Sequence, residues 1–587
     1  MSPSGHSDFA RSSVQKVLRT PLVQWVFLLG LPLFIFWLFN IRPNHQIDSL
    51  DPYFYTGYIN NARDLLLRLD LPYYAVRFGL ILPGRFLTWV LGPVPGYFAY
   101  HYLLALAGGI PLYWTTRRIF SAPVAIVTYV ALMASPWFER TVLWDHPDAA
   151  GVPYLIAAMC TILIAREPSW WRDALAGCWA CMAVNSNVFT GVIFGIFAVV
   201  YVAISLAYGT SWRSLLSRTR GFLAGFSVVL AVGYSYYWYI FGTPRNIFLT
   251  TFNAANHLTS GGMKEFRTPG YKWLIAATHV HVPILISVCC LLLTLRRGLR
   301  FEAAVCAITG PAVITFFFVH QFLLNGDTLQ LPYYFSYALP STFLMLACLW
   351  QELWTRFSGR PGAFAAWAIA SLVAPMLLVC ANVLWLETLT RWLWPALSVV
   401  TLVLFCLTRF HWPKPALRSA LALAGLPILA LASYSGSTDY YSIARPFTLK
   451  DDSWMDQYRV ALQLIKETPK LSDGPGNVLF WYNDRAGNPI NSVQSVYVWG
   501  YTKLNRAGEP GMPHLGPFQM AQLRSVGVRY IVLLGEAPQE VTQGLEALKK
   551  SGAGYDLLST RDLHSGAFHV YWQLIQITSR PPAPPGK

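Results

Sequence analysis

The sequence predicts a polytopic α-helical membrane protein of about thirteen transmembrane helices, with a small α/β domain at its C-terminal end. Three observations predict this fold class. Of the 587 residues, 55% are hydrophobic and 12% are charged, and the mean hydropathy is +0.40, which is too apolar for a water-soluble globular protein. Many apolar runs are long enough to cross a bilayer, and short basic connections separate them. After residue 434 the long apolar runs stop, and shorter mixed patterns follow.

The first span is predicted at Leu22 to Phe39. Arg11, Lys16 and Arg19 precede it, and no small-residue cleavage pattern follows it. A signal peptide would need such a pattern, so we interpret this span as a retained anchor.

A long loop, residues 40–96, separates this span from the next. Its segment from Asp51 to Asp70 predicts an amphipathic helix that lies along the membrane interface. The runs Leu71-Pro72-Tyr73-Tyr74 and Leu82-Pro83-Gly84 are expected to break the chain after it, because proline disfavours continued helix.

Twelve more spans follow from the apolar runs, and the short ones near Ala122, Ala174 and Ser419 have the weakest support. They are predicted at Tyr97 to Thr116, Ala122 to Ser135, Ala149 to Ala165, Ala174 to Val184, Val188 to Tyr208, Phe222 to Phe241, Val280 to Leu295, Glu302 to His320, Tyr333 to Trp350, Ala363 to Leu386, Leu393 to Phe410 and Ser419 to Ala432.

Clusters of arginine and lysine predict the orientation. They fall at the N-terminus and on alternate connections, which the positive-inside rule places in the cytoplasm. The loop at residues 40–96, the later loops Trp137 to Asp148, Gly242 to Lys272 and Gln321 to Pro332, and everything after Tyr434 then share the opposite side. In a bacterium this is a multi-pass inner-membrane protein with a cytoplasmic N-terminus and a periplasmic C-terminus.

The chain therefore divides into three predicted parts: a transmembrane catalytic part at residues 1–434, a periplasmic α/β domain at 435–579 and a proline-rich, disordered tail at 580–587. In the second part, helices are predicted at Trp454 to Thr468 and Val541 to Lys550, and strands at Asn477 to Tyr482, Tyr530 to Leu534 and Phe568 to Ile577.

The charge distribution, the cysteines and the glycine pattern argue against several function classes. The net charge of +16 comes from basic clusters between apolar runs, which topology explains, so no nucleic-acid partner is expected. The nine cysteines all lie in apolar stretches and suggest no disulfide framework or zinc ribbon. No glycine-rich phosphate loop appears in a strand-turn-helix context.

The first candidate site is the acidic pair Asp48 and Asp51, directly after the first span. One interpretation is helix capping, with Pro52 at the first helical position. The other is that one carboxylate points into a cavity at the membrane face, where it acts as a general base or holds a metal ion.

A second acidic site, Asp145, His146 and Asp148, lies on the same predicted side of the membrane. Asp148 is also a good helix N-cap. Carboxylates from both sites are oxygen ligands for a hard divalent ion such as Mg²⁺, Mn²⁺ or Ca²⁺, so Asp48 and Asp148 are candidate metal ligands.

Cations and aromatic residues on this side could bind an anionic lipid substrate. Arg77 and Arg85 are candidates for a lipid phosphate, because guanidinium groups bind phosphate with two donors. The alternative for each is a side chain that snorkels to lipid headgroups. Tyr333 and Tyr334 could stack on a sugar or cover a prenyl chain, although aromatic residues at membrane interfaces are usually anchors.

Together these features resemble the GT-C superfamily of integral-membrane glycosyltransferases, which includes protein O-mannosyltransferases, the aminoarabinose transferase of lipid A and oligosaccharyltransferase subunits. The family's first-loop aspartate corresponds to Asp48 or Asp51. Its later aspartate before a span resembles Pro147-Asp148-Ala149-Ala150, and its Arg-Tyr-x-Leu-Pro segment resembles Tyr333 to Pro340. Three features depart from the family: Asp48-Ser49-Leu50-Asp51 replaces Asp-Glu, the Lys-Pro-Pro segment is absent, and so is the arginine expected near Tyr334.

The resemblance implies transfer of a sugar from a polyprenyl-phosphate donor, with inversion, to a periplasmic cell-envelope acceptor that is a glycan, a lipid or a protein. Two alternatives stay open. One is a transporter or lipid flippase, in which the carboxylates relay protons or ions. The other is a glycan ligase or polymerase that uses a pyrophosphate-linked donor.

Overall fold

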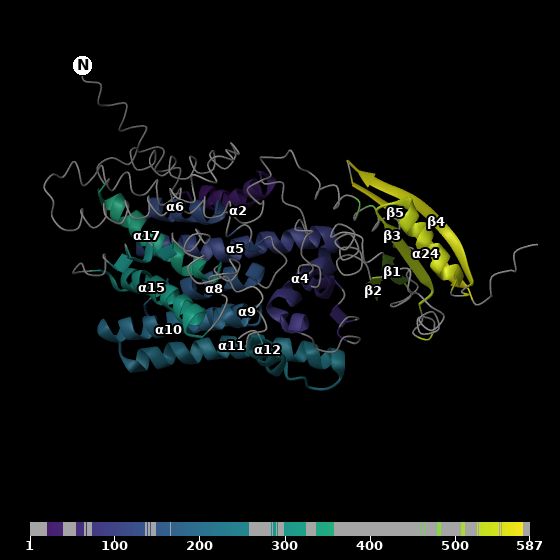
Figure 1. Ribbon diagram of the computed structural model, residues 1–587. Helices are drawn as coiled ribbons and strands as arrows, with labels where there is room; N and C mark the ends of the chain where they lie inside the picture. The colour runs from purple at the N-terminus through teal and green to yellow at the C-terminus, as the bar shows by residue number, and fades with distance from the viewer. Residues whose placement is uncertain are drawn as a thin grey trace, which may run out of the picture.

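The computed structural model describes residues 20–38, 55–66, 73–135, 138–142, 148–257, 283–291, 299–324, 336–356, 478–482, 506–510 and 525–578, with gaps of one or two residues inside some ranges, and residues 460 and 463. The N-terminal part is an array of helices, and a mixed β-sheet lies to one side of it (Figure 1). The helices are α2 (Pro21–Leu38), η1 (Tyr73–Val76), α4 (Phe78–Leu91), α5 (Pro93–Ile119), α6 (Ala122–Met133), α8 (Asp148–Leu163), α9 (Trp170–Val184), α10 (Val188–Ala207), α11 (Trp212–Phe241), α12 (Ile247–His257), α15 (Phe301–Phe322), η4 (Ser336–Ala338) and α17 (Leu339–Arg356).

Three of the described helices are long and apolar enough to cross a membrane: α10, α11 and α15, with 20, 30 and 22 residues. Shorter apolar helices lie within α2, α4, α6 and α8. The predicted total of about thirteen spans includes Ala363 to Leu386, Leu393 to Phe410 and Ser419 to Ala432, which lie outside the described residues, so the total stays a prediction.

Helices α2, α6, α8, α10 and α15 begin and end within two residues of their predicted bounds. Helix α11 begins ten residues before its predicted span and α17 is shifted by six residues, while α4 and α12 lie in segments that were predicted as loops. In helix α8, the side chains from Ala149 to Cys160 are almost fully buried, as expected of a helix with neighbours on all sides. Caps define other ends: Asn187 accepts a hydrogen bond from the Phe189 backbone N–H at the start of α10, and Gly242 ends α11 with a φ of 66°.

The predicted chain break at Leu82-Pro83-Gly84 is wrong, because Pro83 lies inside α4. Phe78, Leu80 and Ile81 are buried on one side of this proline, and Gly84 is buried on the other. Apolar helices in membrane proteins tolerate an internal proline where tertiary packing holds both sides of it. The predicted interfacial helix is helical at its described residues, 55–60, 62, 63 and 66.

Glycine residues allow a close contact between α9 and α11. A Cβ atom on Gly225 would lie 1.8 Å from the Ala174 carbonyl oxygen, and one on Gly177 would lie 2.0 Å from the Phe222 carbonyl oxygen. At each of these points a glycine of one helix lies against the backbone of the other, which is a common way for helices to pack closely in membranes.

Several basic residues lie together at one end of the array, where Arg172 interacts electrostatically with Arg218 and Arg118. There, Arg218 of α11 forms an ion pair of 3.0 Å with Asp173 of α9 and also donates to Tyr201 and to the Ile162 carbonyl. Arg166 donates to the Tyr208 carbonyl at 2.7 Å. Along α11, Tyr237 lies about 28 Å from this end, at 1.5 Å per residue, which is close to the thickness of a hydrocarbon core.

The C-terminal sheet has five strands in the order β2-β1-β3-β5-β4. The strands are β1 (Val478–Tyr482), β2 (Arg506–Pro510), β3 (Tyr530–Gly535), β4 (Gly554–Ser565) and β5 (Phe568–Thr578). Strands β2, β1 and β3 are parallel, whereas β5 is antiparallel to both β3 and β4. Helix α24 (Pro538–Lys550) packs Val541 and Leu548 on the sheet residues Ile531, Leu533 and Ile575.

The sequence predicts β1, β3, α24 and β5 but misses the two edge strands. β2 reads Arg-Ala-Gly-Glu-Pro, and β4 is polar and mostly exposed. Edge strands bury little surface and need no apolar run, so an apolar pattern does not reveal them.

Candidate functional site

The structure places only some of the predicted site residues. Asp48, Asp51, Asp145, His146, Tyr333 and Tyr334 lie outside the described residues. Asp148 is the first residue of α8, and its side chain is not among those described. Arg77 and Arg85 are both described, and the residues around them form the candidate site.

Arg77 immediately precedes α4, and only 2% of its surface is exposed. Its backbone carbonyl accepts from the Ile81 N–H at 2.9 Å, which fixes the start of the helix. Tyr237, near the far end of α11, donates its hydroxyl to the Ala75 carbonyl at 2.5 Å and interacts electrostatically with Arg77. Arg77 is thus a buried cation and not a side chain that snorkels into solvent.

The described part of the first loop packs against the segment that precedes this arginine. Tyr55 and Tyr58 are each 1% exposed. The centroids of the Tyr55 and Tyr74 rings are 5.4 Å apart. Tyr55 comes four residues after Asp51, and Tyr74 comes three residues before Arg77. Burial raises the pKa of Tyr58, so its hydroxyl keeps its proton at neutral pH. The chain leaving the first acidic stretch therefore contacts the segment that leads to Arg77.

Arg85 lies two turns along α4 from Arg77. It is half-buried and donates from Nη1 to the Asn60 carbonyl at 3.2 Å, and it interacts electrostatically with Tyr236. Arg85 therefore ties α4 to the helical residues that follow the first acidic stretch.

The turn between α9 and α10 packs against the start of α4. The Gly79 N–H donates to the Asn185 carbonyl at 3.2 Å, and a Cβ atom on Gly79 would lie 2.6 Å from the Ser186 hydroxyl. Glycine is therefore required at residue 79 for α4 to approach this turn. Ser186 and Thr190 are both fully buried.

The same turn reaches the second acidic stretch. Gly151, one helical turn after Asp148, lies 3.8 Å from Ser186 and 3.6 Å from the Tyr337 ring, measured from the position its Cβ atom would take. Tyr337 belongs to η4, three residues after Tyr334, and is fully buried. We call Tyr58, Arg77, Arg85, Ser186 and Tyr237 the Arg77 site; the backbone of α8 at Asp148 begins beside it.

Sequence reasoning missed Tyr58, Ser186 and Tyr237. The asparagine-serine-asparagine turn, residues 185–187, was the available signal, because three polar residues between two apolar runs are unusual in this chain. Tyr237 had no such signal, since it lies in an aromatic run at a helix end where interfacial anchors are common.

Metal ligation at Asp48 and Asp148 stays a prediction. Among the described residues, the side chains grouped closely enough to share a metal ion are Asp562, His564 and His569, on β4 and β5. The sequence did not predict this group, because it did not predict β4.

No family model and no curated protein matches the sequence. Solved structures similar to the chain include ArnT from Cupriavidus metallidurans bound to undecaprenyl phosphate, with 15% identity and a TM-score of 0.49 over 96% of this chain and 100% of that chain. The oligosaccharyltransferase AglB from Archaeoglobus fulgidus, in complex with an inhibitory peptide and a dolichol-phosphate, is similar with 12% identity and a TM-score of 0.43 over 91% of this chain and 73% of that chain.

Proposed function

We propose that this chain is a membrane glycosyltransferase that moves a sugar from a polyprenyl-phosphate donor to a cell-envelope acceptor. The observation that carries the proposal is Arg77, a buried cation at the end of the helix array, which interacts with Tyr237 of α11 and whose chain neighbours Val76 and Phe78 pack in one cluster with Tyr58 and Cys181.

A buried guanidinium in a membrane protein is costly unless it serves a structural or a functional role. Arg77 lies near Tyr237, at the opposite end of α11 from the buried ion pair of Arg218 with Asp173. The phosphate of a membrane lipid lies at the membrane surface, level with the ends of the transmembrane helices, and the hydrocarbon chain of the lipid lies alongside the apolar helices. Arg77 and Arg85 suit such a phosphate in charge, and arginine binds phosphate with paired donors.

In the proposed reaction, an acceptor hydroxyl attacks the anomeric carbon of the donor. The new bond to the acceptor oxygen forms as the bond to the phosphate oxygen breaks, so the configuration inverts and polyprenyl phosphate leaves. Asp48 or Asp51 takes the hydroxyl proton, and Arg77 and Arg85 stabilise the charge on the departing phosphate. Asp145, His146 and Asp148 are assigned to the acceptor, or with Asp48 to a divalent ion such as Mg²⁺, Mn²⁺ or Ca²⁺. Tyr333 and Tyr334 are assigned to the sugar or the prenyl chain.

Binding of undecaprenyl phosphate to the purified full chain tests the phosphate site without knowledge of the sugar. We expect binding to be measurable by native mass spectrometry and to weaken about tenfold or more in Arg77→Lys, which keeps the charge but loses the paired donors. Arg220→Lys is the matched control, because it makes the same substitution at an exposed arginine at the other end of α11.

Arg85→Lys serves as a second variant if Arg77→Lys fails to fold. Unchanged binding in well-folded Arg77→Lys and Arg85→Lys would refute the phosphate assignment. Tighter binding of a polyprenyl pyrophosphate than of the monophosphate would favour the ligase or polymerase. Movement of lipid across reconstituted vesicles, driven by a proton gradient, would favour the transporter instead.

A further inference from the structure

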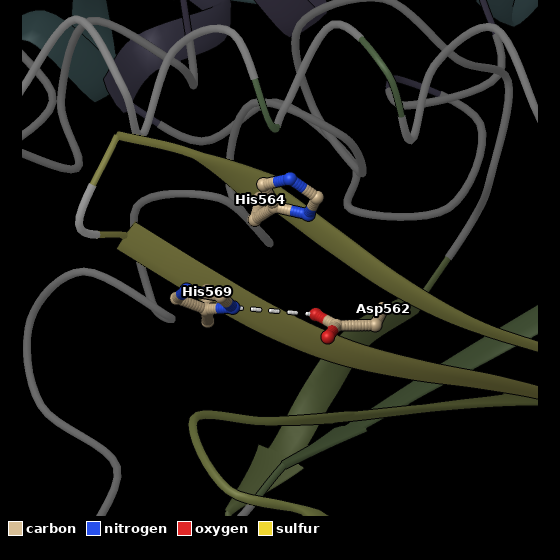
Figure 2. A group of neighbouring side chains, drawn as sticks. All are labelled: Asp562, His564 and His569. Atoms are coloured by element: carbon tan, nitrogen blue, oxygen red, sulfur yellow. Dashed lines mark hydrogen bonds and ion pairs between the residues drawn. The ribbon is translucent and has the colours of Figure 1, made fainter.

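Two histidines and an aspartate converge at the end of the β4–β5 hairpin (Figure 2). His564 and His569 are directly opposite each other across the two antiparallel strands, and their rings stack with centroids 5.4 Å apart. Asp562 lies two residues before His564 and therefore on the same face of β4. The register alone brings all three side chains to one face of the sheet.

The spacing of the ligand atoms fits a small metal ion. One ligand atom from each of the three residues lies within 4.8 Å of the others, and His569 Nδ1 is 3.4 Å from Asp562 Oδ1. Zinc binds imidazole nitrogen and carboxylate oxygen at roughly 2.0–2.2 Å in a tetrahedron, whose edges are then roughly 3.3–3.6 Å. The aspartate and one histidine already have this separation, and a side-chain rotation of the exposed His564 would complete the set.

We propose that Asp562, His564 and His569 form a binding site for a divalent transition metal of the zinc class. Imidazole ligands favour zinc, copper and nickel over magnesium and calcium, so this site differs in chemistry from an oxygen-ligand site at Asp48 and Asp148. Three protein ligands leave a fourth position open for water or for an anionic group. The site is independent of the proposed transferase reaction, and each proposal stands or fails by its own test.

A bound ion would join β4 to β5 at the exposed end of the hairpin. β4 is an edge strand, so β5 is its one neighbour in the described sheet. Cross-linking the two strands through the metal would stabilise this edge against fraying, because metal that binds only the paired strands adds its binding free energy to their pairing.

Zinc titration of the full chain, purified in detergent with a histidine-free tag, tests the proposal. We expect the wild type to bind one zinc ion more per chain than His564→Ala or His569→Ala, and Asp562→Asn to bind that ion at least about tenfold more weakly. Asp556→Asn is the matched control: Asp556 is an exposed aspartate of the same strand outside the group, and this variant should keep the full stoichiometry.

Cobalt in place of zinc gives a second readout that a purely structural effect would not produce. The wild type should show visible absorption bands typical of four-coordinate cobalt with nitrogen and oxygen ligands, and His564→Ala should lose them. Equal zinc stoichiometry in wild type and both histidine variants, or absence of these bands from the wild type, would overturn the proposal.

Discussion

At the scale of single residues, the acidic pair in the first loop carries the most specific chemical claim. Asp48→Asn and Asp51→Asn remove one carboxylate each and keep the size of the side chain. We expect the substitution of the true base to lower the rate of sugar transfer by ~10²–10⁴, and the other to have a smaller effect. Transfer assays on both single variants distinguish the two carboxylates. Full activity in both singles and in the double variant would remove this pair from the mechanism.

A second residue-scale prediction concerns the buried ion pair Asp173–Arg218. Asp173 is 3% exposed, so Asp173→Asn leaves the arginine charge buried without its carboxylate. Breaking such a pair costs about 3–5 kcal/mol in soluble proteins, and we expect a clear fall in the thermal unfolding temperature in detergent. Glu167→Gln removes an exposed carboxylate at the same end and should leave that temperature unchanged. Equal stability of the two variants would show that the pair contributes little.

A charged residue that stands out in an apolar chain is easily recognised in the sequence as a candidate, although its role stays a prediction. Arg77 was selected for this reason, and its burial supports a specific role over a snorkelling side chain. Tyr237 could not be selected, because its role depends on where α11 meets the segment before α4. That meeting is a long-range contact between residues 162 positions apart, and no local pattern encodes it.

At the scale of elements, the close contact of α9 and α11 predicts a sharp sensitivity to added methyl groups. Gly225→Ala would place a Cβ atom 1.8 Å from the Ala174 carbonyl oxygen, so the helices must separate. We expect a loss of about 1–3 kcal/mol in stability, seen as a lower thermal unfolding temperature. Gly195→Ala is the control, because its Cβ atom meets nothing within 4 Å. This control should be neutral or slightly stabilising, since alanine has a higher helix propensity than glycine. A similar response of the two variants would contradict the tight contact.

Helices were predicted more accurately than strands for a physical reason. A membrane helix satisfies its own backbone and needs only an apolar run, which is visible in the sequence. Strand β4 depends on its pairing with β5 and carries polar, exposed side chains, so its local sequence gives no strand signal. The missed strand is also why the group Asp562, His564 and His569 was missed.

At the scale of the whole molecule, the two ends of the helix array should face opposite sides of the membrane. Ser211 and Thr243 flank α11 and are both exposed. In a cysteine-free background, we expect a membrane-impermeant maleimide to label Thr243→Cys but not Ser211→Cys in intact spheroplasts. Both should react after lysis, which controls for accessibility. The reverse pattern would place the Arg77 site in the cytoplasm and exclude a periplasmic reaction.

The most direct test of the central claim is mass spectrometry of polyprenyl-linked sugars and envelope glycans in cells that lack this protein. The cells are complemented either with the wild type or with the double variant Asp48→Asn, Asp51→Asn. The transferase account predicts that a lipid-linked sugar accumulates, that one sugar disappears from an envelope component, and that only the wild type restores both. Unchanged lipid-linked sugars and intact glycans in the deletion strain would contradict it.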